Sequence, residues 1–230
     1  MTPDFRLKML ELTNSKPTVS MEELNAFPQS DMDEAVLALR TNGFVTSSDG
    51  VLTTTCGQRV MLAESLIHSG VDAKRVSRLL RWQEFEDFAQ HILSENGFLT
   101  HKHLVFKSSL GRREIDILAW NDTLLLAVDC KHWLKGLSTG RMKAAAQAQV
   151  ERSTALARRP ELLHKLKVQH PYGRSIIPVI LALGDPRDQL IDGVPIVPVS
   201  KLLSFIYGVS PIDTRIKRVG INRAYQAQLT

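Results

Sequence analysis

The sequence predicts a mixed α/β protein in which a sheet is flanked by helices and is preceded by a small helical domain with a hairpin. Helical patterns and short β-prone runs alternate along the chain without an internal repeat. A polar turn near residue 121 joins two apolar runs, which predicts adjacent strands. The length of 230 residues allows two domains, each with its own core. We place these domains at residues 1–79 and 80–230.

The first domain is predicted to hold three short helices and a hairpin. A capping box of Ser20 and Glu23 opens the second helix, and Asp31 caps the third helix, which ends at Gly43. The predicted elements are helices at 4–14, 20–26 and 31–42, a hairpin around Ser-Asp-Gly at 48–50, and a longer helix at 57–80. The hairpin directly after the third helix resembles a winged-helix domain over residues 1 to about 65.

The third helix of this domain carries more acids than bases. Asp31, Asp33 and Glu34 stand against the single Arg40. Acids at a helix N-terminus favour the helix but repel an approaching phosphate. Two interpretations therefore stay open: the domain reads DNA, or it serves as a dimerisation or positioning module.

The second domain is predicted to contain a sheet between helices. The predicted order is a helix at 81–97 ended by Gly97, an extended segment at 98–109, the hairpin at 114–133, an alanine-rich helix at 138–159 stopped by Pro160, strands at 176–183 and 194–199, and a final helix from about Ser200.

Charge and composition bound the possible partners. The chain carries a net charge of +5, and residues 80–230 hold 21 Lys and Arg against 14 Asp and Glu, whereas residues 1–79 are slightly acidic. A polyanion such as DNA is a plausible partner for the basic part, and a solvated basic surface is the alternative. The apolar runs are too short to cross a membrane, and the start of the chain lacks a signal-peptide pattern. Two cysteines without metal-type spacing fit a reduced, cytoplasmic chain.

Charged residues interrupt the hairpin EIDILAWNDTLLLAVDCKHW at 114–133. Alternation along a strand places Glu114 and Asp116 on one face, and Asp129 and Lys131 on one face of the next strand. A two-residue turn opposes Glu114 and Asp129, whereas a four-residue loop opposes Asp116 and Asp129. Either loop gathers the charges. A solvated hairpin face with edge charges is the alternative.

Two neighbouring carboxylates repel unless a cation lies between them. Mg²⁺ prefers hard oxygen ligands, and Mn²⁺ is the alternative ion. A lysine beside such a metal can orient an attacking water or stabilise a charged transition state. The pattern therefore predicts a site for phosphodiester hydrolysis.

The preceding helix offers a third acid. At about 100° per residue, Glu86 lies at the border of the apolar face, whereas Glu84 and Asp87 point away from it. We expect Glu86 to face the sheet, and a border glutamate that reaches solvent is the alternative.

Phe85-Glu86 in a helix, Ile115-Asp116 in a strand and Asp129-Cys130-Lys131 in the next strand together resemble the PD-(D/E)XK nuclease superfamily, with its restriction-endonuclease-like fold. The similarity spans roughly residues 80–207 and is nearest to the Mrr-type and archaeal Holliday-junction-resolvase branches. It departs from the pattern at Ile115, which replaces the proline, and at Asp129, where Mrr-type members often have glutamine.

The resemblance implies roles for several residues. Glu86, Asp116 and Asp129 would be metal ligands, Lys131 the catalytic lysine, and Gln149 in the following helix a further catalytic residue, unless Gln149 is an ordinary surface glutamine. Phosphate contacts are expected from the basic residues in the segments that flank the site, although each alone is typical of a solvated surface. These are Lys107, Arg112, Arg113, Lys135, Arg141 and Lys143.

The function expected from these features is a Mg²⁺-dependent endodeoxyribonuclease that uses a metal-activated water. A homodimer is expected because cutting both strands commonly needs two sites. Three alternatives stay open: an inactive nucleic-acid-binding protein of nuclease fold, a Holliday-junction or branched-DNA resolvase, and a winged-helix transcription factor.

Overall fold

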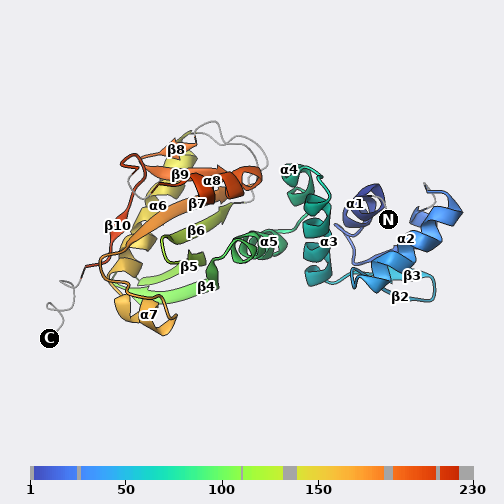
Figure 1. Cartoon of the computed structure of the whole chain (residues 1–230), viewed down its shortest axis with the longest axis horizontal. Coiled ribbons are helices and arrows are strands. Elements are labelled where there is room, and N and C mark those ends of the chain that lie inside the picture. The colour runs from blue at the N-terminus through green and yellow to red at the C-terminus, as the bar shows by residue number, and fades with distance from the viewer. Residues whose placement is uncertain are drawn as a thin grey trace. The chain divides into compact units, whose positions relative to one another are not determined.

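The computed structural model describes residues 3–24, 27–109, 111–131, 139–183, 189–210 and 213–222. The chain divides into two compact units, Met1–Phe88 and Ala89–Thr230. The division lies inside helix α5 (Trp82–Glu95), so one helix belongs to both units. The sequence placed the boundary earlier, after residue 79. Figure 1 shows the elements of both units in chain order.

The first unit is mostly helical and contains a small sheet. Its elements before α5 are α1 (Pro3–Leu12), β1 (Thr18–Ser20), the 3₁₀-helix η1 (Met21–Leu24), α2 (Gln29–Thr41), β2 (Thr46–Ser48), β3 (Val51–Thr53), α3 (Cys56–His68) and α4 (Ala73–Ser77). The three strands pair in the antiparallel order β1-β3-β2. The predicted long helix at 57–80 is thus two helices, α3 and α4.

Local side-chain chemistry explains several boundaries in this unit. The turn between β2 and β3 is Asp49-Gly50, and both residues have positive φ, which suits a tight hairpin. Glu23 accepts a hydrogen bond from the backbone N–H of Ser20, as the predicted capping box requires, but only a 3₁₀-helix follows. Helix α2 begins earlier than predicted, with Pro28 rather than Asp31 at its N-cap.

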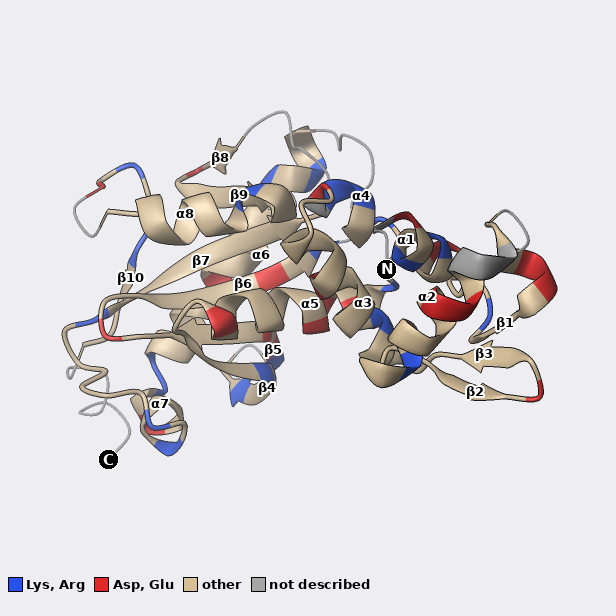
Figure 2. Ribbon diagram, turned by 45° about the vertical axis from the view of Figure 1, so that its right-hand side comes forward, with Lys and Arg blue, Asp and Glu red and all other residues tan. Residues whose placement is uncertain are grey.

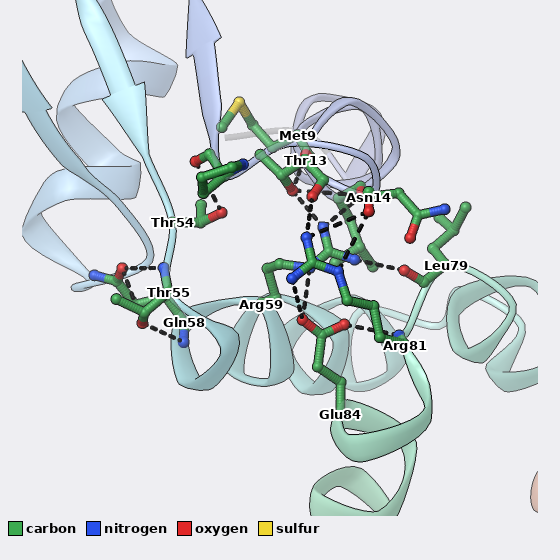
Figure 3. Close-up of polar contacts among 12 residues, drawn as sticks. Met9, Thr13, Asn14, Thr54, Thr55, Gln58, Arg59, Leu79, Arg81 and Glu84 are labelled. Atoms are coloured by element: carbon green, nitrogen blue, oxygen red, sulfur yellow. Dashed lines mark hydrogen bonds and ion pairs between the residues drawn. The ribbon is translucent and has the colours of Figure 1, made fainter.

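A buried arginine holds the core of the first unit together (Figure 3). Arg59 on α3 is 1% exposed, and its Nε donates to Oε1 of Glu84 on α5 at 3.0 Å. Its Nη1 donates to the carbonyl of Leu10 and to the hydroxyl of Thr13, and its Nη2 donates to the carbonyl of Leu79. Because each nitrogen of the guanidinium donates to an acceptor and Glu84 supplies the opposite charge, the buried charge is tolerated inside the core.

The second unit is built on a mixed sheet. After α5 it comprises β4 (Leu99–Ser108), β5 (Gly111–Trp120), β6 (Leu125–Lys131), α6 (Thr139–Ala157), α7 (Pro160–Lys165), β7 (Ser175–Ala182), β8 (Leu190–Ile191), β9 (Val194–Pro198), η2 (Val199–Lys201), α8 (Leu202–Gly208) and β10 (Val219–Gly220). The predicted order of elements in this domain is therefore present, and α7, β8 and β10 are additions.

Seven strands of the described residues form this sheet. They follow the order β4-β5-β6-β7-β9-β8, and β10 pairs with β7. β6 pairs with β7 and β7 with β9 in parallel, whereas the remaining pairs are antiparallel. The parallel pairing of β6 with β7 requires a crossover connection, and α6 is part of that connection. The prediction of a mixed α/β sheet with flanking helices is confirmed.

Helix α6 covers one face of the sheet (Figure 1). Leu156 and Ala157 near its end share a core cluster with Leu118 and Ala127. Met142 and Ala146 near its start pack with Ile180 and other residues of β7 to β9. Cys130 is fully buried, as expected from its position on the strand, and both cysteines are free thiols.

The turn between β5 and β6 fixes the register of the two strands. Trp120 pairs with Leu125, so the loop has four residues, the second of the two predicted possibilities. Asn121 sets this loop because its Oδ1 accepts the backbone N–H groups of Thr123 and Leu124 at 3.0 and 2.8 Å. Arg174, which precedes β7, also stabilises this loop, because its Nη2 donates to the carbonyls of Asn121 and Leu124. Burial lowers the pKa of Arg174, and the nearby Asp122 carboxylate partly offsets this effect.

The alternation of side chains along β5 is interrupted at Asp116. β4 and β5 keep one register throughout, but the pair formed by His103 and Asp116 is missing from the ladder. His103 has a φ of 51°, in the left-handed region. Ile115 then shares a core cluster with Leu118, although strict alternation would put the two on opposite faces. The simple parity assumed from the sequence is therefore wrong at this point.

No helix in the described ranges is long and apolar enough to cross a lipid bilayer.

Candidate active site

Two acids and a lysine lie together where β5 and β6 part. The ladder between these strands ends at the pair of Ile117 and Val128, one step before Asp116 and Asp129 would oppose each other. At that step a side chain takes the place of a backbone acceptor: Oδ2 of Asp116 accepts a hydrogen bond from the backbone N–H of Cys130 at 2.8 Å. Asp116 is thereby held beside the chain segment that carries Asp129 and Lys131.

Asp129 is buried and is neutralised by two cations. The residue is 3% exposed. Its Oδ2 lies 2.8 Å from Nζ of Lys131, and its Oδ1 accepts a hydrogen bond from Nη2 of Arg152 at 2.7 Å. Both carboxylate oxygens of Asp129 are thus in direct contact with a cationic side chain. A metal ion that binds Asp129 would therefore have to share the carboxylate with Lys131 and Arg152.

Gln149 on α6 is part of the same arrangement. It is fully buried, and its Nε2 donates to the carbonyl of Ala127 on β6 at 2.7 Å. Its Oε1 accepts a hydrogen bond from Nε of Arg152 at 2.8 Å. The alternative of an exposed surface glutamine is wrong for Gln149, but it describes Gln147, which is exposed and bonds to Glu151.

Arg152 is the residue of this cluster that sequence reasoning missed. It lies three residues after Gln149, on the same face of α6. That spacing was the available signal, because a helix that presents Gln149 to the sheet also presents residue 152.

Glu86 lies on α5 in the part that belongs to the first unit, whereas the other predicted site residues lie in the second unit. Glu86 is 3% exposed, so the alternative of a solvent-reaching glutamate is wrong. Glu84, which the helical angles placed away from the apolar face, is also fully buried, because Arg59 provides a counter-ion that the sequence pattern does not reveal. Glu114 contributes nothing to the cluster of Asp129; it is exposed and lies 3.2 Å from Nδ1 of His103.

The candidate site offers two carboxylates to a divalent metal. In the part of the chain that the structure describes, no three His, Cys, Asp or Glu side chains are arranged to hold a metal ion. Asp116 and Asp129 nevertheless supply hard carboxylate oxygens, and Oδ2 of Asp116 is bound to the N–H of Cys130, the residue that follows Asp129. These two acids are of the type that Mg²⁺ and Mn²⁺ bind.

The basic residues predicted to contact phosphate fall on two elements of the second unit. Lys107 on β4 pairs with Arg112 on β5, both are exposed, and Arg113 beside them is partly exposed. Arg141 and Lys143 are exposed in the first two turns of α6. Figure 2 colours these basic positions blue along the ribbon. Lys135 lies outside the described residues.

Two solved structures and one protein sequence are similar to parts of the chain. No family model matches the chain. A protein of unknown function gives a TM-score of 0.31 with 18% identity over 45% of this chain and 47% of that structure. A Vibrio cholerae protein of known structure gives a TM-score of 0.36 with 11% identity. The match covers 90% of this chain and 49% of that structure. The chain thus spans about half the length of both solved structures.

One relative is close enough in sequence to define a family. An uncharacterized protein of Archaeoglobus fulgidus is 33% identical over 128 residues, which cover 55% of this chain and 90% of that protein. The chain belongs to the same family as this uncharacterized Archaeoglobus fulgidus protein.

Proposed function

We propose that the protein is a Mg²⁺- or Mn²⁺-dependent endodeoxyribonuclease. The observation that carries the proposal is the grouping of Asp116, Asp129 and Lys131 where β5 and β6 part. Two carboxylates that could hold a divalent metal, with an ammonium beside them, suit phosphodiester hydrolysis by water without a covalent enzyme intermediate.

Each side chain has a role in this proposal. Asp116 and Asp129 would hold the metal, and the resemblance to the PD-(D/E)XK nucleases implies Glu86 as a further ligand. When bound, the metal would acidify a water and provide a counter-charge for the phosphate oxygens. Lys131, whose Nζ is 2.8 Å from Asp129, orients that water or stabilises the negative charge that develops on the phosphate. Gln149 fixes the position of α6 against β6 through the carbonyl of Ala127.

The order of elements supports the same proposal. The run α5, β4, β5, β6, α6, β7, β9, α8 is compatible with a restriction-endonuclease-like domain. The run α1, β1, η1, α2, β2, β3 is compatible with a winged helix. In this proposal the first unit binds DNA or joins two copies of the chain, and the exposed bases of β4, β5 and α6 contact phosphates.

The test is cleavage of supercoiled plasmid, branched DNA and single-stranded DNA with Mg²⁺ or Mn²⁺. We expect Asp116→Asn and Lys131→Ala to lower the cleavage rate at least about 100-fold, the scale of losing one electrostatic group of an active site. Asn keeps an oxygen that can accept the N–H of Cys130, so Asp116→Asn separates chemistry from folding.

The matched controls are Glu114→Gln and Lys165→Ala, which make similar charge changes at exposed positions. Both controls should cleave at the wild-type rate. Wild-type activity in both Asp116→Asn and Lys131→Ala would reject the site. Preference for branched over plasmid DNA would identify a resolvase.

A second candidate is a nucleic-acid-binding protein of the same fold that does not cut. The observation that favours it is the double pairing of Asp129, since Lys131 and Arg152 already neutralise the carboxylate. Calorimetry decides between the two: DNA binding without any Mn²⁺ binding, in the presence or absence of DNA, would favour the second candidate.

A further inference from the structure

The Arg152 side chain is built into β6 by a closed chain of hydrogen bonds. The carbonyl of Ala127 accepts from Gln149 at 2.7 Å, Gln149 accepts from Nε of Arg152 at 2.8 Å, and Nη2 of Arg152 donates to Asp129 at 2.7 Å. Ala127 and Asp129 belong to the same strand, so the guanidinium is fixed at both ends. Gln149 is fully buried and Asp129 nearly so, whereas the Arg152 side chain is 22% exposed. The guanidinium of Arg152 is therefore fixed in position while part of its side chain remains accessible to solvent.

The four charged side chains of this cluster balance one another. Asp116 and Asp129 carry two negative charges, and Lys131 and Arg152 carry two positive charges. A divalent cation that binds these two carboxylates leaves positive charge in excess beside Lys131 and Arg152, and an excess of one charge remains where Glu86 adds a third carboxylate. Like charges a few ångströms apart in a protein repel strongly enough to weaken metal binding at least about tenfold. A phosphodiester that enters with the metal removes part of this excess.

We propose that Arg152 makes divalent-cation binding at Asp129 dependent on a phosphodiester. This inference rests on the proposed function, because it takes the metal to bind at Asp116 and Asp129. Without nucleic acid, Arg152 acts as the counter-ion of Asp129 and opposes the metal. With nucleic acid, the exposed side of the same guanidinium contacts a phosphate oxygen, for which its planar donors are suited. Arg152 is thus a positioning residue for Asp129 and a contact for the substrate.

The experiment measures Mn²⁺ affinity from the electron paramagnetic resonance signal of free Mn²⁺, with and without a short DNA duplex. In the wild-type protein, the duplex should tighten Mn²⁺ binding at least about tenfold, and by linkage Mn²⁺ should tighten duplex binding by the same factor. In Arg152→Gln, Mn²⁺ alone should bind at least about tenfold more tightly than in the wild type, and the effect of the duplex should shrink.

Two further variants separate charge from packing. Arg152→Lys keeps the positive charge and should retain weak Mn²⁺ binding without DNA. Arg158→Gln removes an exposed charge just beyond the same helix and should behave as the wild type. The wild-type titrations test the coupling even where a variant fails to fold.

Each result has a definite meaning. Equal Mn²⁺ affinity with and without duplex in the wild type, or no gain in Arg152→Gln, would overturn the role of Arg152 and leave the nuclease proposal intact. Coupled binding without any cleavage would support Arg152 and reject the nuclease. No Mn²⁺ binding under any condition would overturn both.

Discussion

Arg59 and Glu84 form a buried ion pair whose side chains are 1% and 0% exposed. Glu84 has a second role, because its Oε2 accepts the backbone N–H of Arg81 at 2.8 Å at the start of α5. The pair thus joins α3 to the first turn of α5, and Thr13 and Leu10 bind the same guanidinium at the end of α1. Removal of one partner would leave the other charge inside the core.

The ion pair of Arg59 and Glu84 should contribute strongly to stability. Glu84→Gln and Arg59→Met should each lower the free energy of unfolding by about 3–5 kcal/mol, the usual cost of leaving one buried charge unpaired. Urea denaturation followed by circular dichroism measures the change. Arg75→Gln serves as the control, since Arg75 is exposed and lies 4.0 Å from Glu11; it should cost less than about 1 kcal/mol. A loss of this small size in Glu84→Gln as well would contradict the structural role.

At the scale of single elements, β4 contains a residue in an unusual conformation. His103 adopts a φ of 51° opposite Asp116, where the side-chain alternation changes. A β-branched residue tolerates the left-handed region poorly, although it favours strands in general. The position therefore tests whether backbone conformation or strand propensity decides stability.

His103→Val should destabilise the protein by about 1–3 kcal/mol, the range for a strained backbone position. His101→Val is the matched control, because it makes the same change two residues earlier in β4, where φ is ordinary; it should be neutral or slightly stabilising. Thermal or urea unfolding gives both values. If the two variants lose equal stability, the conformation of His103 does not constrain the strand.

The elements themselves show which parts of the fold the sequence could predict. Apolar periodicity gave the strands and most helices, and Gly43, Gly97 and Pro160 marked the ends of helices because their backbone preferences act locally. The interruption at His103 was not predicted, since the sequence around this histidine contains no signal for a left-handed φ. The burial of Glu84 was also missed, because its partner is 25 positions away in sequence.

The proximity of the candidate site residues was predicted in part. Asp116, Asp129 and Lys131 were expected to lie together because strand register is a short-range property set by the loop at Asn121. Arg152 was not found, because its contact with Asp129 spans 23 positions and depends on how α6 crosses the sheet. Distances of that kind follow from packing of elements and not from local pattern.

For the whole molecule, the helix shared by the two units sets where the chain can be divided. A cut after residue 79 would remove Glu84 from the unit that contains Arg59. The boundary suggested by the sequence therefore separates a buried ion pair. A cut after residue 96 keeps α5 complete.

We expect the fragment 1–96 to unfold cooperatively in urea, and the fragment 1–79 to be unfolded or only marginally stable, because Arg59 would be buried without its carboxylate. The fragment 1–96 carrying Glu84→Gln is the control and should lose stability in the same direction as 1–79. Equal stability of 1–79 and 1–96 would contradict this expectation. The same 1–96 fragment permits a direct test of duplex binding by the first unit.

The crossover from β6 through α6 to β7 also has a consequence for biosynthesis. The ribosome makes the chain from its N-terminus, so β4, β5 and β6, with Asp116, Asp129 and Lys131, are synthesised before Arg152 and before the parallel partner strand β7. Hairpin-connected strands form contacts that are local in sequence, whereas the pairing of β6 with β7 must close a long loop. A nascent chain therefore holds both acids and the lysine for a time without the arginine that balances them.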